Sequence, residues 1–171
     1  TELKKVSNEF FVAGLIHDIG KLVIYITLPN EFLKLVKATR HLKLKFMAFE
    51  TEKRAIGMTH DEVGMRPLKK WMFPESLLTA IGFHHRLQET DKKSLLPVVV
   101  HIADIFAHLY EMQTVVEEDD PLKTETLFPD IIKLAQSYEI EWDESDLNRL
   151  QQSLTESIEK EAVAFSLFFG N

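Results

Sequence analysis

The sequence predicts an all-α protein without a significant β-sheet. Apolar residues recur at spacings of three and four along almost the whole chain of 171 residues, as they do in amphipathic helices. Prolines, glycines and capping residues divide that pattern into segments of helix length. No stretch shows strand alternation or a hairpin turn, although Val23, Ile24 and Ile26 favour a strand by propensity alone. The length is sufficient for one domain with a full hydrophobic core.

The helices expected in order along the chain follow from these breaks. Residues 9–27 begin amphipathic and become almost wholly apolar, which predicts a buried helix. Pro29 and Asn30 end it. The short helix at 31–39 carries its apolar side chains on one face, at Phe32, Leu35 and Val36. A further amphipathic helix is expected at 45–57, ending near Gly57.

The segment THDE, residues 59–62, predicts the start of the next helix. The Thr59 hydroxyl can accept a hydrogen bond from the Glu62 amide, and the Glu62 carboxylate can reach back to the Thr59 amide. This helix is expected to end near Trp71. Pro74 then suits the first turn of a helix that ends near His84.

The polar segment 86–94 predicts a loop, and the apolar segment 95–112 predicts a long central helix. Residues 115–126 form an acidic connection. A short helix at 129–138 and a long one at 143–169 follow, and the long helix has an apolar stripe at Leu147, Leu150, Leu154, Ile158 and Phe165. We therefore expect a helical core over residues 1–115, with the connection and the C-terminal helices of 116–171 packing on it.

Composition excludes several classes of function. The net charge of −7 argues against a nucleic-acid binder, which needs a basic face. The chain has no cysteine, so any metal must be held by His, Asp or Glu. The first residues are too mixed for a signal peptide, and the apolar runs are shorter than the roughly 20 residues of a membrane span. We expect an intracellular, cytoplasmic protein without a membrane partner.

Four sets of polar residues interrupt the apolar pattern: His17 with Asp18, His60, His84 with His85, and Asp104. Divalent metals need imidazole and carboxylate ligands that converge from several helices. Neighbouring helical residues project about 100° apart, so an adjacent His-Asp pair shares an ion best near a kink or helix end. Gly20 allows a second backbone to approach closely. Together the six positions favour one shared metal site.

Structural roles are the alternative for each residue taken singly. His41 and His108 are more simply explained as hydrogen-bonded structural residues. His60 can be solvated in the first turn of its helix. His84 and His85 end a helix, where the dipole favours an imidazolium. Asp104 lies on one helix face with His101 and His108, and it can pair with Lys21 or Arg54 without any metal.

The chain resembles the HDOD domain, a bacterial branch of the HD superfamily. The resemblance rests on FFVAGLIHDIGKLVI, on HDEVG from His60, on FPESLLTAIGFHH and on VVVHIADIFAHL, and it covers residues 8 to 112. It implies an HD-superfamily-like helical bundle with a signalling role. The same order of residues is similar to that of the HD-GYP phosphodiesterases, which cleave cyclic di-GMP with two or three metal ions.

Carried over by position, the resemblance implies that six residues are metal ligands and that Lys21 lies near substrate phosphate in an active enzyme. The implied ligands are His17, Asp18, His60, His84, His85 and Asp104. Two features depart from the HD-GYP pattern. No Gly-Tyr-Pro motif follows the His pair, and no histidine precedes His17 to supply the superfamily's opening ligand. The resemblance also implies further HDOD helices upstream of Thr1.

Two functions remain open from the sequence. The first is a signalling output or scaffold module that does not catalyse a reaction, contacts partner proteins or attached sensor and receiver domains, and retains one or two divalent ions of Fe, Mn, Mg or Ni. The second is a metal-dependent phosphohydrolase or phosphodiesterase acting on a nucleotide or cyclic dinucleotide. A weaker third hypothesis is nucleotide binding without cleavage. The missing Gly-Tyr-Pro motif and opening histidine favour the first.

Overall fold

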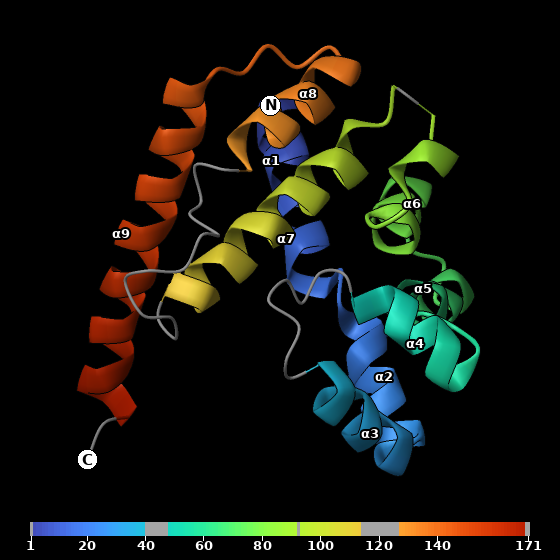
Figure 1. Cartoon of the computed structure of the whole chain (residues 1–171). Coiled ribbons are helices and arrows are strands. Elements are labelled where there is room, and N and C mark those ends of the chain that lie inside the picture. The colour runs from blue at the N-terminus through green and yellow to red at the C-terminus, as the bar shows by residue number, and fades with distance from the viewer. Residues whose placement is uncertain (1, 40–47, 92, 114–126, 170–171) are drawn as a thin grey trace. The chain divides into compact units, whose positions relative to one another are not determined.

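The computed structural model describes residues 2–39, 48–91, 93–113 and 127–169. Its helices are α1 (Glu2–Ile16), α2 (Ile19–Thr27), α3 (Pro29–Thr39), α4 (Ala48–Ile56), α5 (His60–Lys70), α6 (Glu75–Phe83), α7 (Leu95–Gln113), α8 (Phe128–Ser137) and α9 (Glu144–Phe169), with a short 3₁₀ turn at Leu87–Glu89 (Figure 1). No strand occurs among these residues, and the predicted all-α class is confirmed.

The chain divides into two compact units, Thr1–Met112 and Gln113–Asn171. The first unit contains α1 to α6 and nearly all of α7, and the second contains α8 and α9. The acidic connection expected at 115–126 lies outside the described residues, as do the side chain of Phe165 and all of His41. The packing of the C-terminal helices on the core stays a prediction.

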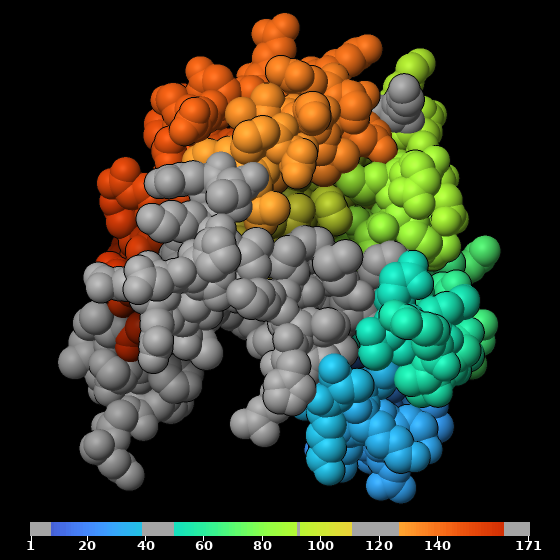
Figure 2. Space-filling view, viewed as in Figure 1, coloured from blue at the N-terminus to red at the C-terminus, as the bar shows by residue number. Residues whose placement is uncertain are grey.

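The predicted continuous helix over residues 9–27 is wrong. The chain leaves helical geometry at His17 and Asp18, and α2 begins only at Ile19 (Figure 1). The expected burial of this segment is also wrong, because Tyr25 and Ile26 on α2 are 51% and 68% exposed. Figure 2 shows the blue surfaces of α2 and α3 open to the viewer. The polar pair therefore occupies a turn between two short helices.

One apolar segment, Asn8–Thr27, is long enough to cross a membrane by length and composition alone. The expectation that the apolar runs are shorter than a membrane span is therefore wrong for this segment. In the structure the turn at His17 and Asp18 divides this segment into two helices. Such a segment is weak evidence for a membrane span, because helices of soluble proteins pass the same test.

Gly20 sets the distance between α2 and α5. A Cβ atom on Gly20 would lie 1.7 Å from the carbonyl oxygen of His60 and 2.8 Å from the backbone nitrogen of Gly64. Gly64 is similarly close, since its own Cβ would lie 3.0 Å from the Gly20 nitrogen. The two backbones therefore touch, as predicted for Gly20, and α2 is held against the first turn of α5.

The core of the first unit lies between α1, α5, α6 and α7. Its buried members are Ala13, Leu68, Leu77, Leu78, Ala80, Ile81, Leu96 and Val100. The α5 start has the predicted capping box, in which the Thr59 amide donates to the Glu62 carboxylate at 3.2 Å. This core fixes the end of α6 and the start of α5, which carry three of the candidate ligands.

Two predicted apolar stripes are only partly buried. On α3, Leu35 is buried but Val36 is 47% exposed. On α9, Leu147 is fully buried, whereas Leu150 is 43% exposed. A helical spacing shows which side chains share a face of the helix. How much of that face is buried depends on the element that packs against it.

Candidate metal centre

All six predicted ligands come together in the first unit. His17 and Asp18 occupy the α1–α2 turn, His60 is the first residue of α5, His84 and His85 follow α6, and Asp104 lies on α7. The structure forms two groups whose ligand atoms lie within 4.8 Å of one another. One group is His60, His84 and His85, and the other is His17, Asp18 and His84. The two groups share His84.

The carboxylates approach the imidazoles closely at this centre. His60 Nε2 lies 3.1 Å from Asp18 Oδ1, and His17 Nε2 lies 3.6 Å from Asp18 Oδ2. Asp104 Oδ1 lies 3.4 Å from His17 Nε2. Nevertheless Nε2 of both histidines and Oδ1 of Asp18 are buried without hydrogen-bond geometry to any described residue. These atoms lie close together without forming hydrogen bonds to one another, as ligands directed at one common point would.

The opposite ring nitrogens of three histidines are already engaged. Nδ1 of His17 lies 2.8 Å from the Gly14 carbonyl, and Nδ1 of His84 lies 3.0 Å from the Ile81 carbonyl. Nδ1 of His60 lies 2.7 Å from the Glu52 carboxylate. Because these partners are acceptors, each Nδ1 donates a proton, and Nε2 of each ring is the nitrogen that offers a lone pair when the imidazole is neutral.

This arrangement is the one that metal-binding histidines adopt. A ligating imidazole donates its other N–H to a carbonyl or carboxylate, which fixes its tautomer and its ring orientation. Here Nε2 of His17, His60 and His84 are all buried without a hydrogen-bond partner in the described structure. The residues present therefore fit a divalent ion, with nitrogen and carboxylate oxygen as its donors.

Electrostatics at the α1–α2 turn favour a charged pair. Burial lowers the pKa of His60, but the carboxylates of Asp18 and Glu52 outweigh it and raise that pKa to about 9. Burial raises the pKa of Asp18, but His60, Lys21 and His17 hold it well below its usual range. An ion at this centre would have to displace the His60 proton, so metal binding releases a proton.

The His pair behaves differently. Burial and the neighbouring His60 lower the pKa of His84 to about 4. Burial and His84 lower the pKa of His85 to about 2. These pKa values favour neutral imidazoles at pH 7 over the alternative of an imidazolium stabilised by the helix dipole. Neutral imidazoles are the form that binds a metal.

Glu52 was missed by the sequence analysis. It is buried on α4 and accepts from both the backbone amide and the Nδ1 of His60, each at 2.7 Å. In the sequence it lies in the charged run ETEKR, where it resembles its exposed neighbour Glu50. The sequence pattern does not distinguish Glu52 from Glu50, because they differ in the tertiary contact that Glu52 makes with His60.

A second missed pair fixes the segment that carries the two histidines. Asp61 is fully buried, and its carboxylate accepts from Arg86 Nε at 3.2 Å. Arg86 also donates to the Gly82 carbonyl at 2.9 Å. Since Arg86 directly follows His85, this ion pair joins the end of α6 to the residue beside His60.

Two structural alternatives for single residues are wrong. His60 is not solvated, because its side chain is 1% exposed. Asp104 does not pair with Lys21 or Arg54. Among the described residues Asp104 lies next to His17 and His108, the latter at 3.3 Å. Lys21 instead donates to Asp18 Oδ2 at 2.6 Å.

Comparison with known proteins adds a family match. Residues 1–87, just over half of the chain, match the HDOD domain family. An uncharacterized protein of Treponema pallidum (strain Nichols) is 27% identical over 77 residues, which make up 45% of this chain and 15% of that protein. No solved structure matches. The family match includes five of the six candidate ligands and ends before Asp104.

Proposed function

This chain belongs to the HDOD domain family, and on that premise we propose that it is a bacterial signalling module. In this proposal its metal centre organises the helical core, and the module acts by contacting partner proteins instead of converting a substrate. The partners are other signalling proteins or attached sensor and receiver domains.

The observation that carries the metal centre is the orientation of the three histidines. His17, His60 and His84 each donate Nδ1–H to a fixed acceptor and direct Nε2 into the cluster. Combined with Asp18 and Asp104, this donor set suits a borderline ion such as iron or nickel better than magnesium, which prefers oxygen ligands. A bound ion would supply Lewis acidity and would link the α1–α2 turn, α5, the end of α6 and α7.

The hydrogen bond between Lys21 and Asp18 favours the signalling module over the enzyme. A lysine that positions substrate phosphate directs its ammonium at the phosphate, but here one of the three ammonium N–H groups is directed at Asp18. The chain also lacks the Gly-Tyr-Pro motif of the HD-GYP phosphodiesterases. Both features argue that the centre is structural.

One observation favours the second candidate, a metal-dependent phosphohydrolase. Asp18 places Oδ1 3.1 Å from His60 Nε2 and Oδ2 3.6 Å from His17 Nε2, so its carboxylate could bridge two neighbouring ions. Two ions can activate water and stabilise phosphate oxygens on both sides of a displacement. In that enzyme Lys21 would have to leave Asp18 to hold a phosphate oxygen.

Elemental analysis tests the metal centre directly. We expect about one or two equivalents of a divalent ion in protein purified without chelator or nickel resin. Replacement of His17 or Asp18 with Ala should remove this metal and lower the melting temperature, because the ion joins four elements. His41→Ala is the matched histidine control and should change neither quantity. Unchanged metal in the His17→Ala variant would disprove the assignment.

A screen with phosphodiester and nucleotide substrates separates the two candidates. The signalling proposal predicts no turnover by the metal-loaded protein. Turnover that needs the metal and is lost in both Lys21→Ala and His17→Ala would establish the phosphohydrolase and overturn the proposal.

A further inference from the structure

The turn between α5 and α6 exposes two large apolar side chains. Trp71 is 64% exposed and Met72 is 89% exposed. Phe73 comes next but turns inward, where it packs on the core of the first unit. We refer to Trp71 and Met72 as the α5–α6 tip.

The backbone of the tip is a Schellman motif, a common way for a helix to end. The Phe73 amide donates to the Leu68 carbonyl and the Met72 amide to the Lys69 carbonyl, each at 3.1 Å. Met72 has a φ of 57° and thus occupies the left-handed position that usually carries glycine. The end of α4 shows the usual choice, with Gly57 at a φ of 79°.

A methionine at this position is unfavourable unless its side chain has a use. A Cβ atom disfavours left-handed geometry, which glycine adopts freely. The Met72 side chain is almost wholly exposed, so packing within the described structure does not compensate. Glu139 has the same geometry at the end of α8, so the feature peculiar to Met72 is its large apolar side chain in the solvent, which a contact outside the folded unit would cover.

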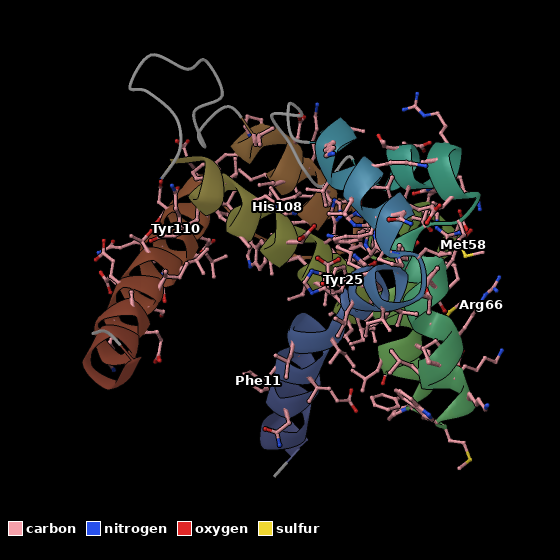
Figure 3. The ribbon with its side chains drawn as sticks, turned by 90° about the horizontal axis from the view of Figure 1, so that it is seen from below. Phe11, Tyr25, Met58, Arg66, His108 and Tyr110 are labelled. Atoms are coloured by element: carbon pink, nitrogen blue, oxygen red, sulfur yellow. The ribbon has the colours of Figure 1, made fainter. Side chains whose placement is uncertain are left out.

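The surface on the α5 side of the tip is basic, while the α6 side begins with the exposed Glu75. Arg66, Lys69 and Lys70 lie in the last turns of α5 and are all exposed. Arg66 points away from the ribbon into open space (Figure 3). None of the three forms an ion pair within the part of the chain that the structure describes. This positive patch stands out in a chain with a net charge of −7.

We propose that the tip and its three basic neighbours dock a short acidic segment of a partner protein. An apolar side chain of that segment would pack on Trp71 and Met72, while its carboxylates face Arg66, Lys69 and Lys70. Tryptophan and methionine are effective anchors, since both bury much apolar area and methionine adapts to its partner. This inference rests on the proposed signalling function, for which it names the surface and the partner's chemistry.

A protein segment suits this patch better than an anionic membrane. Membrane attachment through charge usually needs four to eight basic residues or a long amphipathic face. The patch offers only three cations and two apolar side chains. In addition, the net negative charge of the chain repels an extended anionic membrane surface. A single segment, in contrast, meets only the local charge.

Fluorescence of Trp71 provides the test. The chain has two tryptophans, so a Trp142→Phe background makes Trp71 the one reporter. The probes are amphipathic peptides of about twelve residues that carry glutamates on one face and leucines on the other, with lysine-for-glutamate versions as charge controls. We expect a saturable blue shift with the acidic peptides alone, and a loss of this shift at high salt.

Variants then assign the shift to the patch. A Lys69→Glu, Lys70→Glu double variant and Met72→Gly should each weaken peptide binding by about tenfold or more. Met72→Gly should fold at least as well as the parent, which excludes a simple loss of structure. Glu139→Gly is the matched control, because Glu139 has a φ of 60° at the end of α8 and should leave binding unchanged.

Two results would overturn the proposal. One is the absence of a saturable shift with every acidic peptide. The other is a shift produced by phosphatidylserine vesicles and not by peptides, which would assign the patch to membranes. Metal content of the tip variants should equal that of the parent. Thus the absence of peptide binding would overturn the tip proposal without affecting the metal centre. Conversely, catalysis at the metal centre would overturn the proposed signalling function, and the tip proposal would still be decided by peptide binding.

Discussion

His60 lies between two carboxylates, one at each ring nitrogen. Glu52 accepts from Nδ1 at 2.7 Å, and Asp18 Oδ1 lies 3.1 Å from Nε2. Asp18 can share a metal ion with His60, whereas Glu52 can only orient the ring from behind. Such a carboxylate behind a ligating imidazole raises its basicity and holds its tautomer.

Glu52→Gln should therefore weaken metal binding without removing a ligand. We expect the affinity to fall roughly 10- to 100-fold, as is usual when a carboxylate behind a ligating histidine is lost. Competition with a chelator of known affinity measures this change. Glu50→Gln is the matched control, since Glu50 is exposed on the same helix. Equal affinities in the two variants would show that Glu52 has no role at the centre.

The sequence identifies ligands and supporting residues unequally. His17 and Asp18 are conspicuous because they interrupt an apolar run, and His84 and His85 because they are paired. Glu52 lies in a charged segment, and Asp61 lies in a capping segment where acidic residues are ordinary. Their burial results from contacts with His60 and Arg86, which no local pattern reveals.

At the scale of the elements, the contact between α2 and α5 holds His17 and Asp18 close to His60. Gly20→Ala would place a methyl group 1.7 Å from the His60 carbonyl oxygen, so one helix must move. We expect a destabilisation of about 1–3 kcal/mol or more, measured by chemical denaturation, together with weaker metal binding. Gly14→Ala is the control, because its Cβ would meet no atom within 4 Å. A Gly20→Ala variant as stable as the Gly14→Ala variant would contradict this close approach.

The break between α1 and α2 shows where helix prediction failed. Residues 9–27 are apolar, and the positions of the turn carry neither proline nor glycine, so periodicity predicts one helix. The adjacent His17 and Asp18 did indicate a bend there, because neighbouring helical residues project about 100° apart and share an ion best at a kink or helix end. It could not give the residue at which the helix ends, because this depends on the fit of α2 against α5.

At the scale of the whole molecule, the centre joins segments that are distant in the sequence. Its members come from the α1–α2 turn, α5, the end of α6 and α7, which together span most of the first unit. Figure 3 shows His108, a neighbour of Asp104, on α7. A change of protonation at the centre should therefore affect the stability of the unit and not of one helix alone.

Protein treated with a chelator should accordingly be most stable near neutral pH. His60 has a raised pKa of about 9 against an ordinary value of 6.5, so its contribution is complete below pH 6.5 and is lost as the pH rises through 9. His84 and His85 have lowered pKa values of about 4 and about 2. Below pH 6.5 the unfolded chain binds protons at these two residues that the folded chain does not, so stability falls as the pH decreases.

Melting temperatures measured across this pH range test both limbs. In His60→Gln the alkaline decline between pH 6.5 and 9 should diminish to the share of His17, where burial lowers the pKa but Asp104 and Asp18 raise it by more, whereas the acid decline should remain because His84 and His85 are still buried. Saturating metal should flatten the alkaline limb of the parent protein, since a bound ion replaces the His60 proton at the same nitrogen. A parent protein whose melting temperature rises steadily to pH 9 would show that His60 is not held between the two carboxylates.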